Sequence, residues 1–198
     1  MQTMVGNYCL PDEQGVALAM GRYYGFPTFG LGGSTDSKTL DQQAGMESAL
    51  GLITQTLENA NILHDVGFTD AGMQGSLQLM AICNDIIGWI RAATQGVPIN
   101  KETLDQALDV IEEVGPGNSQ MDHEYTLTHF REAFYPRLAD RNIYSIWAEK
   151  GSTTMAERAS KMIDELIEKH EVKLLPDDIQ KSIGEIIDRE EARLDRHG

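Results

Sequence analysis

The sequence has few cysteines, few basic residues and no long apolar run. It holds two cysteines in 198 residues, Cys9 and Cys83, with no CxxC spacing, which excludes a disulfide framework and a cysteine-based zinc site. Lys and Arg number 16 against 31 Asp and Glu, and the formal charge of -15 disfavours nucleic-acid and anionic-membrane partners. The apolar runs are too short to cross a bilayer, and the first residues lack the basic and apolar regions of a signal peptide. We therefore expect a cytoplasmic protein.

What the sequence does have is a repeated unit, in which a short apolar run leads through a polar cluster into an amphipathic helix. One copy runs through Phe26–Leu31 and Gly32–Lys38 into a helix over 41–59. The next runs through Ala60–Leu63 and 64–67 into a helix over 76–94. Strands alternating with helices of this length predict βαβ units on a parallel sheet, whose chemistry sits in the loops after the strands.

The flanking segments extend this pattern. A strand over Thr3–Leu10 and a helix from Pro11 to Tyr24 would form an earlier βα unit, and its abrupt start suggests that the barrel begins before this chain. After residue 98 we expect mainly helices, with starts at Asn100, Thr154 and Pro176. The chain is therefore expected to form one partial domain, with barrel units over 1–98 and a helical region packed on them over 99–198.

Two strand-end clusters could carry chemistry. Asp36 follows Gly33 after the first predicted strand, where a carboxylate can balance a cation, although an N-cap or a turn would also place Asp there. His64 ends the next strand, where an imidazole could transfer protons, although a packing histidine is equally compatible. Asp65 follows on an extended chain and should point away from His64.

The remaining candidates have simpler interpretations. Asp41 should open its helix, while Glu47 is either solvent-exposed or reaches a neighbouring element. The aromatic residues of 125–147 are expected to serve packing more than ligand binding. His123 and His129 do not have metal-ligand spacing, so we expect no metal site.

A known family shares many short stretches with this chain. They are Tyr24–Pro27, Gly33–Lys38, Asp41–Glu47, Asn61–Gly67, Asp85–Gly88, Val114–Gly117, His123–Arg131, Pro136–Arg141 and Trp147–Gly151. Taken together they resemble the trimethylamine methyltransferase family, the corrinoid-dependent methylamine and betaine methyltransferases. The likeness extends over almost the whole chain.

The resemblance implies a fold and an activity. Members of this family form an α/β barrel and move a methyl group from an amine to the cobalt of a separate corrinoid protein. Their chains are much longer, so this sequence looks like the C-terminal part of a TIM-type (β/α)8 barrel followed by a helical region. Trimethylamine-specific members carry pyrrolysine, whereas all residues here are standard, which favours quaternary amines such as glycine betaine. The corrinoid would belong to the partner, and the chain itself would bind no cofactor.

The expected site combines both arguments. We expect His64 to act in catalysis. The residues expected to bind the substrate are Asp36, Gly33, Asp65, Tyr125 and Asn118. The sequence departs from the family at Asn118–Met121, where a Gly-His-Phe-Leu type continuation is common, and at Tyr125, where His is frequent.

Two other functions stay open at this point. The chain could be a non-catalytic partial barrel that serves as a binding or assembly module. It could also be a different barrel enzyme that uses Asp36 and His64 for acid–base catalysis. With about three readable βα units, the sheet would keep unpaired edges, so we also expect a homo-oligomer and little activity in the isolated chain.

Overall fold

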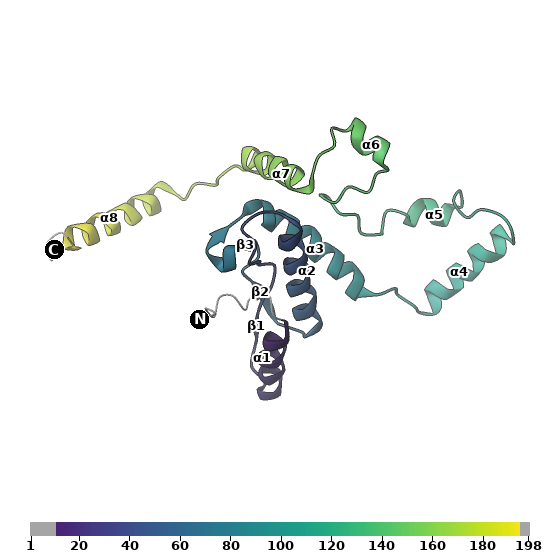
Figure 1. The fold of residues 1–198 in the computed structure, drawn as a ribbon, viewed down its shortest axis with the longest axis horizontal. Coiled ribbons are helices and arrows are strands. Elements are labelled where there is room, and N and C mark those ends of the chain that lie inside the picture. The colour runs from purple at the N-terminus through teal and green to yellow at the C-terminus, as the bar shows by residue number, and fades with distance from the viewer. Residues whose placement is uncertain (1–10, 195–198) are drawn as a thin grey trace. The chain divides into compact units, whose positions relative to one another are not determined.

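The computed structural model describes residues 11–194, and the predicted strand over Thr3–Leu10 lies outside them. The chain divides into two compact units, Met1–Asp164 and Glu165–Gly198. Figure 1 shows a mixed α/β chain with many helices and few strands. The elements of the first half are α1 (Pro11–Tyr24), β1 (Phe29–Leu31), α2 (Gln42–Leu57), β2 (Ile62–His64), β3 (Phe68–Thr69), a 3₁₀ turn (Asp70–Gly72), β4 (Gln74–Gly75) and α3 (Leu77–Gln95).

Helices make up the second half, as predicted. They are α4 (Lys101–Val114), α5 (Glu124–His129), α6 (Tyr144–Glu149), α7 (Met155–Lys169) and α8 (Asp177–Leu194). Among the residues that the structure describes, no helix has the length and apolar character needed to cross a membrane.

The βα alternation builds the expected parallel pair. β1 and β2 pair in parallel with Gly30 opposite Leu63 and Leu31 opposite His64. Helices α2 and α3 lie side by side against this pair (Figure 1), and their core joins Leu52, Leu79 and Cys83 to Leu63 of β2. The antiparallel β3–β4 hairpin was not predicted, because its strands have only two residues each and lack an apolar alternation.

Local sequence sets the helix starts. The side chain of Asp41 accepts a hydrogen bond from the backbone N–H of Ala44 (3.2 Å), and Ser76 accepts one from Leu79 (3.1 Å). Asn100 and Thr103 form a reciprocal capping box at α4. Each of these side chains satisfies an N–H that the first helical turn leaves unpaired. The predicted starts at all three positions are confirmed.

A buried carboxylate fastens the segment before α6 to α3. Asp85 is 3% exposed and accepts backbone N–H bonds from Arg137 (3.1 Å), Leu138 (2.6 Å) and Ala139 (3.4 Å). Leu138 then packs with Ile82 and Ala159 in a second core, which joins α3 to α7. The 136–139 segment is therefore held by hydrogen bonds and apolar packing together.

The expectation that the aromatic residues of 125–147 are mainly core is wrong for most of them. Phe130, Tyr135 and Tyr144 are 59%, 65% and 78% exposed. Helices α5 and α6 have six residues each, too short for an apolar stripe that could bury the rings. Tyr144 contacts the Trp147 ring instead, at 5.6 Å between centroids, while Phe130 and Tyr135 lie under the guanidinium groups of Arg131 and Arg141.

One aromatic contact does hold the segment around Phe134 against α3. Phe134 lies edge-to-face with Trp89 at 6.0 Å, and a Cβ added at Gly88 would overlap its ring. We expect Gly88→Ala to destabilise the protein by about 1–3 kcal/mol, the usual cost of overpacking. Urea unfolding measures this change in the free energy of unfolding. Gly45→Ala is the control, because Gly45 is also helical but has open space around it, so it should stabilise by about 0.5–1 kcal/mol. An equal gain for Gly88→Ala would contradict the contact.

The unit Glu165–Gly198 contains the end of α7 and the whole of α8. Ile179, Ile183, Ile186 and Ile187 form the expected apolar face of α8, and these side chains are 43–51% exposed.

Candidate functional site

Two loops meet at the carboxyl end of the parallel strands. The β1–α2 loop binds the segment after β2 through Thr35 N–H to Phe68 O (3.0 Å) and Asp70 N–H to Ser37 O (2.9 Å). Gly33 O accepts from Gly67 N–H (2.9 Å) and contacts the Cys83 thiol (Sγ–O 3.4 Å). This close approach needs glycine at position 33, where φ is +81° and a Cβ would lie 3.2 Å from Val66.

Glu47 of α2 organises this loop from behind. Its Oε2 accepts from the Thr35 hydroxyl (2.6 Å) and from the Asp36 N–H (2.9 Å), while Oε1 accepts from Gln43 (2.8 Å). Of the two alternatives for Glu47, the structure shows that it reaches a neighbouring element. Sequence reasoning did not assign Glu47 or Thr35 to the site, because nothing in the pattern indicated that residues twelve apart would meet.

Asp36 is the most unusual polar group here. Its Oδ1 is buried and has no hydrogen-bond partner in the part of the chain that the structure describes. Loss of solvation raises the pKa of its carboxyl, and the nearby charges of Glu47 and Asp70 raise that pKa further, against an opposing effect of Lys38. A carboxylate held under these conditions favours a neighbouring cation.

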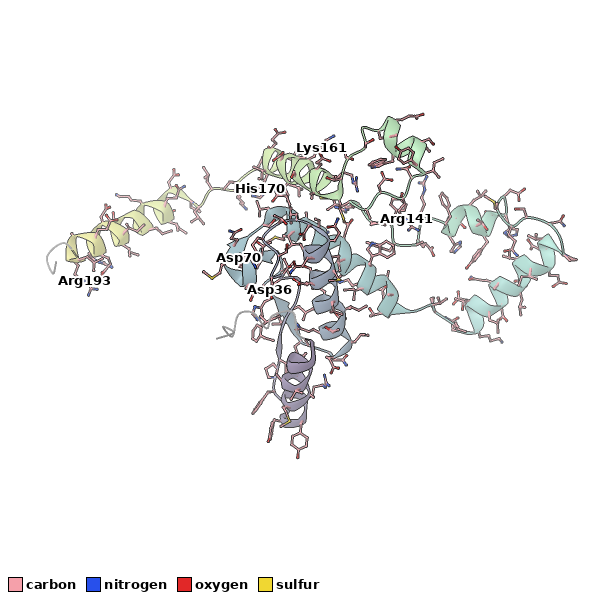
Figure 2. All side chains as sticks on the ribbon, viewed as in Figure 1. Asp36, Asp70, Arg141, Lys161, His170 and Arg193 are labelled. Atoms are coloured by element: carbon pink, nitrogen blue, oxygen red, sulfur yellow. The ribbon has the colours of Figure 1, made fainter. Side chains whose placement is uncertain are left out.

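Lys38 and Asp70 complete this polar cluster, which consists of Thr35, Asp36, Lys38, Glu47 and Asp70. Lys38 Nζ donates to the carbonyl of Asp36 (2.6 Å) and lies 3.5 Å from Asp70 Oδ1. Figure 2 shows Asp36 and Asp70 on adjoining loops of the β-strand region. Asp70 and Ala71 have φ values of 50° and 53°, a left-handed conformation that non-glycine residues rarely adopt and that is concentrated at functional sites.

Asp41 illustrates a different electrostatic role. Hydrogen bonds from Ala44 N–H and the Ser37 hydroxyl lower the pKa of its carboxyl. A lowered folded-state pKa means that this group stabilises α2 above the unfolded-state value and loses that effect as pH falls through the folded-state pKa. Asp41 therefore serves as the N-cap of α2.

His64 ends β2 as predicted, but its pairing differs from the prediction. Its Nδ1 lies 2.9 Å from Asp65 Oδ1, whereas an extended chain would separate the two side chains. The reason is the φ of 65° at Asp65, which turns the chain out of the strand and ends the side-chain alternation. The His64 ring lies edge-to-face with Phe29 at 5.6 Å, and its side chain is 42% exposed.

The two other predicted substrate-binding residues have local partners. Asn118 Nδ2 donates to Val114 O (2.8 Å), which places it in the expected loop after α4. Tyr125 stacks on His129 at 4.0 Å within α5. Among the described residues, no hydrogen bond or ring contact joins either of them to Asp36 or His64. The strand-end residues Gly33, Asp36, His64 and Asp65 therefore share one end of the β1–β2 pair, whereas Asn118 and Tyr125 belong to a separate segment.

Comparison with known proteins identifies the family of this chain. A family model described as trimethylamine methyltransferase (MTTB) matches residues 12–195. The chain belongs to the trimethylamine methyltransferase family. This confirms the family suggested by the short sequence stretches, and the match includes both strand-end loops.

Individual relatives support the same assignment. The trimethylamine methyltransferase MttB1 of Methanosarcina acetivorans is 35% identical over 170 residues, which cover 86% of this chain and 34% of the relative. A glycine betaine methyltransferase of Desulfitobacterium hafniense (strain Y51) is 35% identical over 133 residues, which cover 66% of this chain and 27% of that protein. The chain thus spans about a third of the length of the trimethylamine methyltransferases that it matches.

Within the described part of this family member, no group of three or more His, Cys, Asp or Glu side chains is arranged to hold a metal ion. The polar cluster contains three carboxylates and one lysine, so its own charge is negative. Such a cluster can hold a cation by charge and by backbone geometry that is fixed in advance.

Proposed function

We propose that this chain is part of a methyltransferase that takes a methyl group from a quaternary or tertiary methylamine and passes it to the Co(I) of a corrinoid protein. Family membership supports the reaction class, since the relatives are named for trimethylamine and glycine betaine. The absence of pyrrolysine among the residues of this chain favours a quaternary amine such as glycine betaine.

The observation that carries the proposal is the Asp36 carboxylate. Its buried Oδ1 has no hydrogen-bond donor among the described residues, and Glu47 and Asp70 add negative charge nearby. A quaternary ammonium has no N–H to donate, so an anion can hold it by charge alone. The Asp36 carboxylate, with the negative charge that Glu47 and Asp70 add nearby, therefore suits a cationic ligand of this kind.

In this reaction the chain itself does not supply the nucleophile. The corrinoid protein supplies a Co(I) nucleophile, whose electron pair forms the bond to the methyl carbon while the C–N electron pair leaves with the amine. The task for Asp36 and His64 is to hold the ammonium so that the C–N bond points at the acceptor. Asp36 would bind the positive charge, and His64 with Asp65 would form a side of the pocket.

The exposed face of the β1–β2 pair supports the proposal that these strands belong to a barrel. Phe29 and Ile62 are opposite each other in the β1–β2 pair, and the two side chains are 68% and 52% exposed. Leu63, the residue between Ile62 and His64, packs toward the helices, so the alternation assigns His64 and Phe29 to the opposite face. In a closed TIM-type barrel that face is the packed interior, and His64 would lie at its carboxyl-end mouth.

The formation of a homo-oligomer, expected from the unpaired sheet edges, also stays a prediction.

The test is a methyl-transfer assay on the protein that contains this chain. Co(I) corrinoid protein is mixed with glycine betaine, other quaternary amines or trimethylamine, and loss of the Co(I) absorption is followed. We expect transfer from at least one quaternary amine. Failure with every methylamine, together with turnover of an unrelated polar substrate, would contradict the proposal and favour acid–base chemistry.

His64 can be tested separately. We expect His64→Ala to reduce methyl transfer at least tenfold, while stability changes by less than about 1 kcal/mol, since an exposed side chain contributes little. His129→Ala is the matched control, because its side chain is 40% exposed and also contacts an aromatic ring. The kinetic assay and a thermal melt check both variants. If His64→Ala destabilises the protein but keeps its specific activity, the histidine serves packing.

A further inference from the structure

A basic surface pocket lies beside the segment that Asp85 fastens. Residues 135–142, Lys150 and Arg158 line this cavity, which has a volume of about 250 Å³. Four of the lining residues are cations, namely Arg137, Arg141, Lys150 and Arg158, against one carboxylate, Asp140. In a chain with a formal charge of -15, this is a local excess of positive charge.

Nearby carboxylates balance the charge of these cations only in part. Within residues 11–194, none of the four forms a salt bridge with an Asp or Glu side chain. The Asp140 carboxylate instead accepts from the N–H of Asn142 (2.7 Å) and from its side-chain amide (3.1 Å). These bonds lower the pKa of the Asp140 carboxyl, and the nearby charges of Arg158 and Lys150 lower it further. With one carboxylate against four cations, the pocket retains more positive than negative side chains.

Contacts with neighbouring residues hold the pocket's backbone and its Arg141 side chain in place. Three N–H bonds to Asp85 fix the backbone of 137–139, and Arg158 Nε donates to Leu138 O at 2.7 Å. The Arg141 guanidinium, labelled in Figure 2, lies over the rings of Trp89 (5.6 Å) and Tyr135 (5.7 Å). A guanidinium stacked on rings keeps its in-plane N–H donors available for a planar or tetrahedral oxyanion.

We propose that this pocket binds a small multivalent oxyanion, best matched by a phosphate group. Arg141 would supply paired N–H donors, and Arg137 and Lys150 would add charge. The volume lies below the roughly 300–1,000 Å³ of pockets that hold larger organic ligands. The ligand is therefore inorganic phosphate or the phosphate of a small metabolite, and it has no part in the methyl transfer proposed for the cluster around Asp36.

Calorimetric titration of the full chain with orthophosphate tests the site at constant ionic strength set with chloride. The matched pair is Lys150→Gln and Lys161→Gln, which remove the same charge from exposed side chains that make no hydrogen bond among the described residues. We expect Lys150→Gln to weaken phosphate binding about tenfold, as for loss of one charged contact. Lys161→Gln should leave the affinity unchanged.

Three further measurements test the site more closely. Arg141→Lys keeps the charge but removes the planar fork, and it should weaken phosphate binding severalfold. Acetate, with one charge, should bind at least tenfold more weakly than phosphate. Glycerol phosphate shows the source, since tighter binding than orthophosphate indicates a phosphorylated metabolite and weaker binding indicates inorganic phosphate. Absence of phosphate binding above chloride, or equal weakening by Lys150→Gln and Lys161→Gln, would overturn the proposal.

Discussion

Replacing Asp36 by asparagine is expected to make the protein more stable and the methyltransferase less active. The carboxyl has a raised pKa, because it is desolvated and lies near Glu47 and Asp70. Its folded-state pKa therefore lies above the unfolded value of 3.8, so the folded state binds the proton more tightly. Ionised Asp36 opposes folding at neutral pH, and the neutral amide removes that opposition.

The pH dependence follows with a definite sign. The stability advantage of Asp36→Asn should be complete above the raised folded-state pKa. It should shrink as pH falls through that pKa toward 3.8, because both forms of residue 36 are then neutral in the folded state. Urea unfolding at neutral and acidic pH measures this difference. Asp109→Asn, an exposed change on α4, is the control, and it should show no such gain.

The activity should move in the opposite direction. A charge contact at about 4 Å contributes roughly 1–4 kcal/mol depending on local screening, so kcat/KM for a quaternary amine should fall about 5- to 1,000-fold. A neutral tert-butyl analogue of the substrate serves as a competitive inhibitor. The variant should bind this analogue as well as the native protein does, while it loses preference for the cation. A variant that is both less stable and equally active would show that Asp36 only supports its loop.

Replacing Asp85 by alanine is expected to cause the largest loss of stability. The carboxylate is buried and accepts three backbone N–H groups from Arg137, Leu138 and Ala139. Its removal leaves these donors without partners, and we expect a loss of about 3–5 kcal/mol. Because whole domains have only about 5–15 kcal/mol, this is a large fraction of the total.

Chemical denaturation measures this loss, and two variants control for it. Asp109→Ala makes the same substitution on an exposed helix surface and should change stability little. Asp85→Asn keeps one acceptor oxygen and should fall between the native protein and Asp85→Ala. The phosphate affinity should also drop in Asp85→Ala, since residues 137–139 line the basic pocket. Equal stabilities for Asp85→Ala and Asp109→Ala would show that the N–H bonds contribute nothing.

Features that depend on neighbours in sequence were predictable. The helix starts at Asp41, Ser76 and Asn100 could be predicted because a capping side chain bonds an N–H two or three residues away. The parallel pairing of β1 and β2 follows from strands joined by a helix, which brings both carboxyl ends to one edge.

Features that depend on an unusual backbone conformation or on tertiary packing were not predictable. The His64–Asp65 pair forms because a left-handed φ at Asp65 overrides strand alternation, and the sequence contains no local sign of it. The exposure of Tyr144 likewise depends on how little of the chain packs over the short helix α6. Composition indicates that aromatic rings prefer burial, but it does not indicate what will cover them.

The sequence by itself determined the family, the starts of α2, α3 and α4 and the strand-end position of Asp36 and His64, because motifs, caps and periodicity are local. Only the tertiary structure brought Glu47 to Thr35 and Asp36, and only it set Asp85 under the backbone of 137–139. Both contacts join residues from different elements, and the free energy of burying a carboxylate depends on which donors the fold supplies. That supply differs at the two sites: Asp85 receives three N–H donors, whereas Asp36 Oδ1 has none among the described residues.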